Sequence, residues 1–249
     1  MRALPGVSAA PGIAVGRAVV LDRTRGHASN LVREADRAGE ADRARDALRR
    51  AASDLETLAS QLRTDGRGDD ADIVETGVLM AMDPELIARV DTLILDSGIE
   101  AADALREAAE QTALELSVLL DPMLALRADD VRSVGRRAAA HLKGDALHVS
   151  EGVLIADSLG PADVAELAPR VGGIALAGGG VTAHAAIVAR SLGLPMVVGV
   201  GEGLRNARRS HEPIPNDADQ LAKSRSRGGS SPRGRRTDTG FASWPTHPP

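Results

Sequence analysis

The period of the hydrophobic pattern changes twice along the chain, and these changes limit the folds that the chain can adopt. From about residue 30 to residue 142, apolar side chains recur at three- and four-residue steps, which is typical of amphipathic helices. Short runs rich in Val, Ile and Ala on both sides of this stretch are typical of buried strands. The sequence therefore predicts an α/β fold with an all-α helical bundle inserted into it.

Turn and capping signals divide the helical stretch into several helices joined by short connections, as in a bundle. The run DGRGDD ends the first helix, and Asp83 before Pro84 has the residue types of an N-cap and a first helical position. Ser97 and Gly98 then end that helix. The helices that we expect cover, in chain order, residues 48–62, 72–82, 84–96, 101–120 and 128–142.

Strands are predicted from the short apolar runs, and we expect the first of them to join the later ones in a single sheet. The α/β domain is then discontinuous in the sequence. The strands that we expect cover residues 12–21, 152–157, 172–177 and 195–200. The domains that we expect are an α/β domain of residues 1–29 and 144–205, a helical subdomain of residues 30–143 and a disordered basic tail of residues 206–249.

The tail is predicted from its composition. Residues 206–249 contain 8 Lys or Arg against 4 acidic residues, 6 of the 13 prolines, and the run SRSRGGSSPRGRR. A segment of this kind cannot bury enough apolar surface to order itself. A basic segment rich in Ser and Arg can bind RNA or an anionic membrane, but we favour an unstructured end without a binding task.

The composition also excludes several kinds of chemistry. The chain has no Cys, which excludes disulfide scaffolds, thiolate zinc sites and cysteine nucleophiles. Its only aromatic residues, Phe241 and Trp244, lie near the end of the chain, so the body has no platform for stacking on nucleic acid. With a net charge of −5 and no long apolar run, we expect a cytoplasmic protein that binds neither nucleic acid nor membrane.

The most specific local pattern is GGGVTAHAAIVAR, which follows the expected strand at residues 172–177. Thr182 is expected to cap a helix over residues 183–192, which places His184 in the first helical turn. Backbone N–H groups have no helical partners there, and the helix dipole favours an anion. The glycines leave room for a ligand beside the backbone. An imidazole at such a helix start suits a nucleophile that carries a phosphoryl group.

Taken alone, this pattern leaves two other interpretations open. A histidine beside glycines is more often a structural residue. GGGVTA also fits the G-x-G-x-x-A fingerprint of a dinucleotide-binding domain, with Glu202 at the distance of a ribose-binding acid. The chain lacks the further βαβ units of such a domain. A P-loop is excluded because no Lys-Ser or Lys-Thr pair follows the glycines.

The longer segment GGGVTAHAAIVARSLGLPMVVGVG resembles the phosphohistidine signature of phosphoenolpyruvate-utilising enzymes. The segments GVSAAPGIAVGRAVV at the amino terminus, DPEL at 83–86 and DDVRSVGRRAAAHL at 129–142 are similar to Enzyme I of the sugar phosphotransferase system. The resemblance covers about residues 4–204. The signature is matched at Gly179, Gly180, Thr182, His184, Ile187, Ala189, Arg190, Pro195, Val198 and Gly199.

The resemblance implies a swivelling phosphohistidine α/β domain and an inserted helical subdomain that binds the phosphocarrier protein HPr. It implies that His184 receives a phosphoryl group from phosphoenolpyruvate and passes it to a histidine of HPr. It assigns the phosphate loop to Gly179, Gly180, Thr182 and Arg190. It assigns contact with the basic surface of HPr to Asp69, Asp70, Asp72 and Glu75.

In that family a barrel follows the phosphohistidine domain, binds phosphoenolpyruvate and Mg²⁺, and forms the dimer. Because the resemblance stops near Leu204 and the tail has the composition of a wrong reading frame, we expect a truncated chain without the barrel. We then expect a monomer that binds no metal and exchanges phosphoryl groups with HPr alone. An inactive remnant and an HPr-binding module without chemistry stay open as alternatives.

Four positions depart from the family pattern. Val181 and Ala183 stand where Enzyme I usually has Arg and Ser, which removes a cation and a hydroxyl near the phosphate. Gly160 stands where a Thr usually contacts the phosphohistidine loop, and Gly77 stands where the second helix usually has a His. The remaining histidines near the domain junctions have no motif around them and are interpreted as surface or structural residues: His27, His141 and His148.

Overall fold

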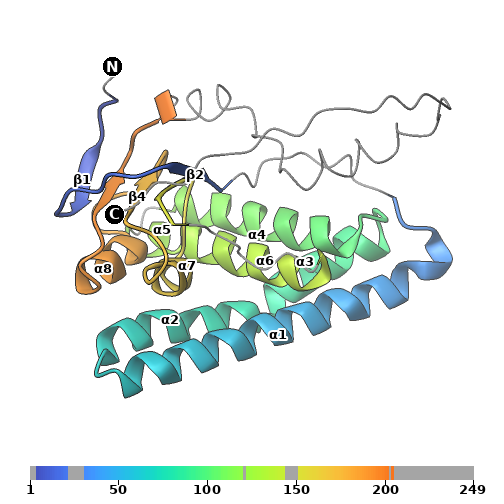
Figure 1. The fold of residues 1–249 in the computed structure, drawn as a ribbon. Helices are drawn as coiled ribbons and strands as arrows, with labels where there is room; N and C mark the ends of the chain where they lie inside the picture. Colours follow the sequence, from blue (N-terminus) through green and yellow to red (C-terminus); the bar gives the residue numbers. More distant parts are fainter. Residues whose placement is uncertain (1–3, 22–30, 120–121, 144–150, 202, 205–249) are drawn as a thin grey trace, which may run out of the picture. The chain divides into compact units, whose positions relative to one another are not determined.

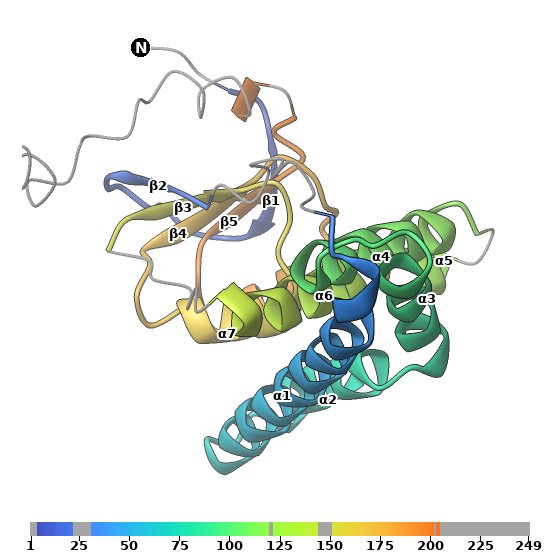
Figure 2. The same ribbon diagram turned by 90° about the vertical axis from the view of Figure 1, so that its right-hand side faces the viewer.

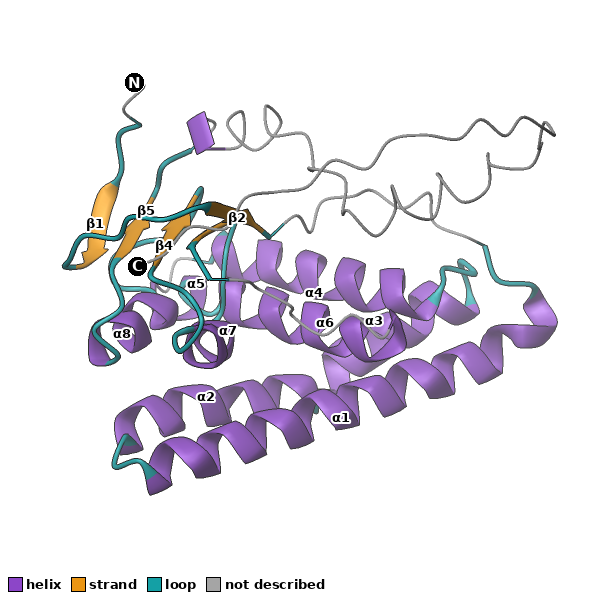
Figure 3. Ribbon diagram, in the orientation of Figure 1, coloured by secondary structure: helices purple, strands orange, loops and turns teal. Residues whose placement is uncertain are grey.

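A computed structural model describes residues 4–21, 31–119, 122–143, 151–201 and 203–204. The predicted tail at 206–249, His27, His148 and Glu202 lie outside the described residues. The structure confirms the predicted fold class, a mixed α/β fold with a helical bundle, as the separate purple and orange elements of Figure 3 show. The bounds that we predict for the domains stay a prediction, because they fall in or beside segments outside the described residues.

The strands of the described residues form one five-stranded sheet in the order β1-β5-β4-β3-β2. Strands β2 to β5 run parallel to their neighbours, and β1 pairs antiparallel with β5 at the edge. Because β2 precedes the helices and pairs with β3 after them, the sheet is built from both sides of the insertion. The strand bounds are β1 Val7–Ala10, β2 Ala18–Val20, β3 Val153–Ala156, β4 Gly173–Leu176 and β5 Met196–Val198.

The prediction of one strand over residues 12–21 is wrong in extent, since only Ala18–Val20 of that run is a strand. Gly12 has a φ of +136°, and a Cβ atom there would lie 2.6 Å from the ring of Pro195. The chain therefore turns at Gly12 and leaves the sheet between β1 and β2. Strand β1, with the sequence VSAA, was missed because small residues over four positions give no strand signal.

The helices confirm the predicted bundle, with some shifted ends. The first helix begins earlier than its leucine pattern, at Arg37, and the second begins at Gly68 instead of residue 72. Asp83 caps the next helix by accepting a 2.8 Å hydrogen bond from the backbone N–H of Glu85. The helix bounds are α1 Arg37–Thr64, α2 Gly68–Ala81, α3 Pro84–Leu95, α4 Ala101–Ser117, α5 Pro122–Ala125 and α6 Ala128–Lys143, after a 3₁₀ turn η1 at Glu34–Asp36.

Small side chains allow the helices of the bundle to pack closely. Helix α1 packs along α2, and α4 packs along α6, as the long pairs in Figure 1 show. At the crossing of α4 and α6, a Cβ atom on Gly135 would lie 2.8 Å from the carbonyl oxygen of Leu105. The buried core of the bundle consists mostly of Ala with Leu, Val and Ile, which accounts for a core without aromatic rings.

Two further helices, α7 (Pro161–Leu167) and α8 (His184–Ser191), cover the same face of the sheet. Figure 2 shows α7 beneath the strands and next to the helical bundle. Buried side chains of β3 and β4 pack against Val164, Leu167 and Val188 of these helices. Helix α7 contacts α6, and α8 contacts α2, within one compact unit of Met1–Ser210. In the described part of the chain, no helix has the length and apolar character needed to cross a membrane.

Candidate functional site

His184 is the first residue of α8, directly after the glycine-rich loop that leaves β4. Gly179 has a φ of +83°, a conformation that favours glycine, and a Cβ atom added at Gly179 or Gly180 would meet nothing within 4 Å. The loop therefore needs a glycine at 179 for its backbone turn. It also has open space beside both residues, where an anion can approach the helix start.

The prediction that Thr182 caps this helix is wrong. The N-cap is Ala183, with extended backbone angles and no capping side chain, and the helix covers 184–191 instead of 183–192. A turn in which the N–H of Ala183 donates to the carbonyl of Gly180 at 3.2 Å moves the helix start along the chain. Thr182 is exposed in this turn, and Gly193, with a φ of +65°, ends the helix as predicted.

The imidazole of His184 is buried and lies against a carboxylate of the helical subdomain. Its Nδ1 atom is 2.8 Å from Oδ2 of Asp130 in α6. His184 is 8% exposed and Asp130 is 5% exposed. Arg127 lies 3.6 Å from the same carboxylate oxygen and donates a 2.9 Å hydrogen bond to the hydroxyl of Thr76. The ring therefore lies in a polar junction of α8, α6 and α2, not in an apolar core.

Sequence reasoning missed Asp130, which lies 54 residues from His184. A signal was present, because Asp130 occupies the buried face of α6 one helical turn before Val134. A charged residue on the apolar face of a helix is rarely buried without a partner. The pattern marks Asp130 as paired, but it does not identify the partner.

Arg190, which the resemblance assigns to the phosphate loop, donates hydrogen bonds to backbone carbonyls of that loop and of β1. Its Nη1 atom donates to the carbonyl of Ala9 in β1 at 2.7 Å and to the carbonyl of Val181 at 2.9 Å. The guanidinium thereby ties the glycine-rich loop to the edge of the sheet. A direct contact of Arg190 with a phosphoryl group stays a prediction.

The four acidic residues assigned to the carrier do not share one surface. Asp69, Asp72 and Glu75 are exposed on α2, and the last two form ion pairs with Arg63. The hydrogen bonds to Glu75 and then to Asp72 raise the pKa of Arg63. Asp70 is buried instead and accepts a 2.6 Å hydrogen bond from the hydroxyl of Ser191 at the end of α8.

Asp70 is part of a contact between α2 and the end of α8. Arg67 lies 3.7 Å from the Asp70 carboxylate and donates a 3.0 Å hydrogen bond to the backbone carbonyl of Ser191. The carboxylate and the guanidinium thus hold the same serine from two sides. We infer that Asp70 fixes the position of α8. This inference does not depend on what Asp69, Asp72 and Glu75 bind.

A second contact joins α6 to the start of α7 around the buried carboxylate of Asp163. This carboxylate accepts hydrogen bonds from the hydroxyl of Ser133 at 2.8 Å, from Arg136 at 3.3 Å and from the backbone N–H of Gly160 at 3.1 Å. Arg137 lies 3.8 Å from Asp163 and 2.6 Å from Glu166. Burial opposes the charge of Arg137, but its hydrogen bond to Glu166 and the charges of both carboxylates raise the pKa of Arg137.

Gly160 is tightly enclosed at this contact. A Cβ atom there would lie 2.5 Å from the Cβ atom of Ser133 and 2.7 Å from its hydroxyl oxygen. The threonine that the family usually has at this position therefore does not fit this arrangement. The contact that such a threonine would make is absent, and Asp130, one helical turn before Ser133, is the partner of His184 instead.

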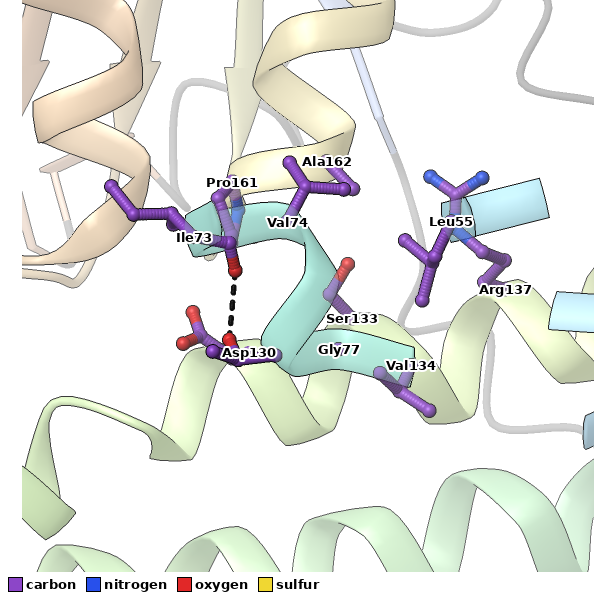
Figure 4. A pocket seen from close by; sticks show the side chains of 11 residues that line it. Leu55, Ile73, Val74, Gly77, Asp130, Ser133, Val134, Arg137, Pro161 and Ala162 are labelled. Carbon is purple, nitrogen blue, oxygen red and sulfur yellow. Dashed lines mark hydrogen bonds between the residues drawn. The ribbon is translucent and has the colours of Figure 1, made fainter. Parts of the chain in front are cut away.

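The small cavity beside these contacts is not a substrate site. It lies between α2, α6 and α7, where Figure 4 shows Ile73, Gly77, Asp130, Ser133 and Pro161 around it. Its volume is about 10 Å³. Holding a single water molecule takes about 10–15 Å³. A Cβ atom at Gly77 would lie 3.1 Å from Leu55, so a larger residue at 77 would disturb this packing.

Two further features concern His141 and metal binding. His141 forms a 2.8 Å pair with Asp54, in agreement with its interpretation as a structural or surface residue. Within the described ranges, no group of three or more His, Cys, Asp or Glu side chains is placed to hold a metal ion. The resemblance assigns Mg²⁺ to the barrel of the family, and that this chain binds no metal stays a prediction.

Comparison with known proteins gives consistent matches over most of the chain. Residues 5–127 match the family described as PEP-utilising enzyme, N-terminal, and residues 149–220 match the PEP-utilising enzyme, mobile domain. The phosphoenolpyruvate-protein phosphotransferase of Priestia megaterium is 34% identical over 203 residues, which are 79% of this chain and 35% of the relative. The enzyme of the same name from Bacillus subtilis strain 168 is 31% identical over 209 residues, 80% of this chain and 36% of the relative.

Two solved structures are similar in fold as well as in sequence. The NMR solution structure of Enzyme I (nEIt) has a TM-score of 0.56 and 33% identity, and the match covers 82% of this chain and 85% of that chain. The N-terminal domain of Enzyme 1 - Nitrogen has a TM-score of 0.56 and 27% identity over 79% of this chain and 83% of that chain. The chain thus spans about a third of the length of the curated relatives, and more than four fifths of these two structures.

Proposed function

The chain belongs to the PEP-utilising enzymes and corresponds to the N-terminal region of Enzyme I, with its phosphohistidine and HPr-binding domains, and from this we propose that His184 carries a phosphoryl group. The observation that supports the proposal is the position of the imidazole. It begins α8 beside the open glycine-rich loop. Backbone N–H groups at a helix start, together with the helix dipole, favour the charge of a phosphoryl group.

The partner that we propose is the phosphocarrier HPr, with which His184 exchanges the phosphoryl group in either direction. The approach of a basic partner is favoured by exposed acidic residues along α2. Asp69, Asp72 and Glu75 follow one another at three-residue steps, and exposed Leu79 extends the same helical face. Charges at the rim with an apolar side chain beside them are typical of a protein interface.

The use of phosphoenolpyruvate itself is a separate proposal. The curated relatives that carry this substrate in their names are about three times as long as the matched region. The activity in their names therefore belongs to the longer proteins and is not assigned to this chain by the match. We propose that this chain exchanges phosphoryl groups with HPr and does not take them from phosphoenolpyruvate without a further domain. The family resemblance assigns the positioning and polarising of that substrate to a barrel that follows the phosphohistidine domain.

Incubation with HPr that carries a ³²P-labelled phosphoryl group tests the exchange. We expect acid-labile label on the wild-type chain, no label on His184→Ala, and unchanged labelling of the matched control His141→Ala. A wild-type chain that binds HPr without taking up label would contradict the proposal and favour a binding module. In a second reaction with phosphoenolpyruvate and Mg²⁺ alone, label on His184 would contradict the restriction to HPr.

A further inference from the structure

We propose that Asp130 is a positioning residue for phosphoryl transfer, which holds the ring of His184 so that Nε2 is the attacking atom. This inference rests on the proposed function of His184. It assigns to a helix of the inserted bundle a direct part in the chemistry of the α/β domain.

The hydrogen bond determines which ring nitrogen carries the proton. Nδ1 lies 2.8 Å from Oδ2 of Asp130, and both residues are buried. An ionised carboxylate only accepts hydrogen bonds, so Nδ1 is the donor. A neutral imidazole has one N–H group, which leaves the lone pair of Nε2 free to attack.

Nε2 is open to an incoming group. Among the described residues, it has no hydrogen-bond partner. In the described part of the chain, the side-chain atoms that are both fully buried and without a hydrogen-bond partner belong to Asp91, Asp103, Arg136 and Arg137. Nε2 of His184 is not one of them. Nε2 therefore keeps some contact with solvent, although the side chain as a whole is only 10% exposed.

The transfer step can be written with these atoms. The lone pair of Nε2 attacks phosphorus and the Nε2–P bond forms. The bond between phosphorus and the imidazole nitrogen of the carrier breaks, and its electron pair stays on the carrier's ring. The ring of His184 gains positive charge while its proton stays on Nδ1, and the carboxylate of Asp130 lies next to that proton and offsets the charge.

The position of Asp130 depends on the close contact of α6 with α7. Ser133, one turn after Asp130, donates to Asp163, and only a glycine at position 160 leaves room for it. The carboxylate of Asp130 can reach His184 only when α6 lies against α7 and the start of α8. We infer that transfer through Nε2 requires this arrangement of the bundle on the α/β domain.

NMR of ¹⁵N-labelled histidine measures the inferred role without phosphoryl transfer, because two-bond couplings distinguish an Nδ1–H ring from an Nε2–H ring. We expect the Nδ1–H form in the wild-type chain and a shift towards the Nε2–H form in Asp130→Ala. Asp130→Asn keeps the size of the side chain, but its amide can accept from or donate to Nδ1, so both forms are expected. Asp129→Ala is the matched control, since the neighbouring Asp129 pairs with Arg132 at 3.1 Å.

The rate of phosphoryl exchange with HPr is the second measurement. Loss of a group that orients a reacting histidine lowers activity by between about 10-fold and about 10⁴-fold. We expect such a loss in Asp130→Ala, a smaller one in Asp130→Asn, and an unchanged Kd for HPr in both. If Asp130→Ala does not fold, as judged by circular dichroism, the Asn variant decides.

The two proposals fail in different ways. A wild-type chain that takes no label from phospho-HPr contradicts the function of His184, while the NMR spectrum still shows whether Asp130 sets the ring. Normal exchange together with an unchanged Nδ1–H form in both Asp130 variants contradicts the role of Asp130 alone. A slower exchange with an unchanged ring form also contradicts it, because the loss would then come from general packing.

Discussion

Helix α8 contacts the helical subdomain at both ends through a buried aspartate, and the two contacts differ in what they hold. At its start, the imidazole of His184 pairs with Asp130 of α6. At its end, the hydroxyl of Ser191 donates to Asp70 of α2. The first contact holds an imidazole, which we propose to be the phosphoryl carrier, and the second holds a serine hydroxyl for which we propose no reaction. Burial and hydrogen bonding of an aspartate are therefore not evidence of a functional site unless its partner can react.

The largest effect on stability is expected at the contact that supports the start of α8. Asp163→Ala removes the carboxylate between Ser133, Arg136 and Arg137. The half-buried guanidinium of Arg136 then loses its ion pair, and Arg137 keeps only Glu166. Breaking a buried ion pair on one side costs about 3–5 kcal/mol. Urea unfolding followed by circular dichroism measures the loss.

The matched control for this variant is Asp46→Ala, which removes an exposed ion pair with Arg49 on α1. Exposed pairs contribute about 0–1 kcal/mol, so the control is expected to unfold close to the wild type. Equal losses in both variants would show that the carboxylate of Asp163 is not the centre of the α6–α7 contact.

A smaller effect is expected from Gly160→Ala. The new Cβ atom would lie 2.5 Å from the Cβ atom of Ser133, so α6 has to move away from α7. Overpacking of this kind costs about 1–3 kcal/mol. We also expect the Nδ1–H form of His184 to decrease, because Asp130 moves with α6. The double variant Gly160→Ala with Ser133→Gly is expected to regain part of both losses, and a double variant no better than the single one would contradict the clash.

Helix α8 and its partners also differ in how much of them is predictable from the sequence. The strand, the glycine loop and the position of His184 in the first turn follow from local patterns that span fewer than 25 residues. The helices of the bundle follow from their apolar period in the same way. These features depend on neighbours along the chain, which a sequence displays directly.

The partners of His184 and Ser191 were not predictable, because they are set by how α6 and α2 pack on the α/β domain. Asp130 and Asp70 both lie on the buried faces of their helices, which marks them as paired but does not name the partner. The family resemblance assigns Asp70 to the same acidic face as Asp69, but neighbouring residues on a helix point in different directions. Asp69 is exposed and Asp70 is buried. Strand β1 was missed since its small residues carry no alternating pattern.

Ser191→Ala sharpens the comparison from the other end of α8. It removes the hydroxyl that donates to Asp70. The carboxylate of Asp70 still has the ion pair with Arg67 at 3.7 Å. Loss of one partner of a buried acceptor costs about 1–3 kcal/mol, and we expect the lower part of that range because Arg67 remains. The Nδ1–H form of His184 and the rate of exchange with HPr are expected to stay unchanged. A loss of the Nδ1–H form in this variant would show that the two ends of α8 are coupled.

The smallest effect on stability is expected on the outer face of α2, opposite the side that carries Asp70. Arg63→Ala removes an exposed cation that pairs with Asp72 and Glu75, and thermal unfolding is expected to stay unchanged. The acidic stripe becomes more negative, so a basic carrier should associate faster at low salt, by less than about tenfold. Stopped-flow association with HPr at about 0.01 M and about 1 M salt measures this, since screening removes the difference at the higher concentration. An association rate that falls in Arg63→Ala would contradict the assignment of Asp72 and Glu75 to the carrier. Of the four acidic residues assigned to the carrier, only Asp70 would then have an inferred task, which is to fix the position of α8.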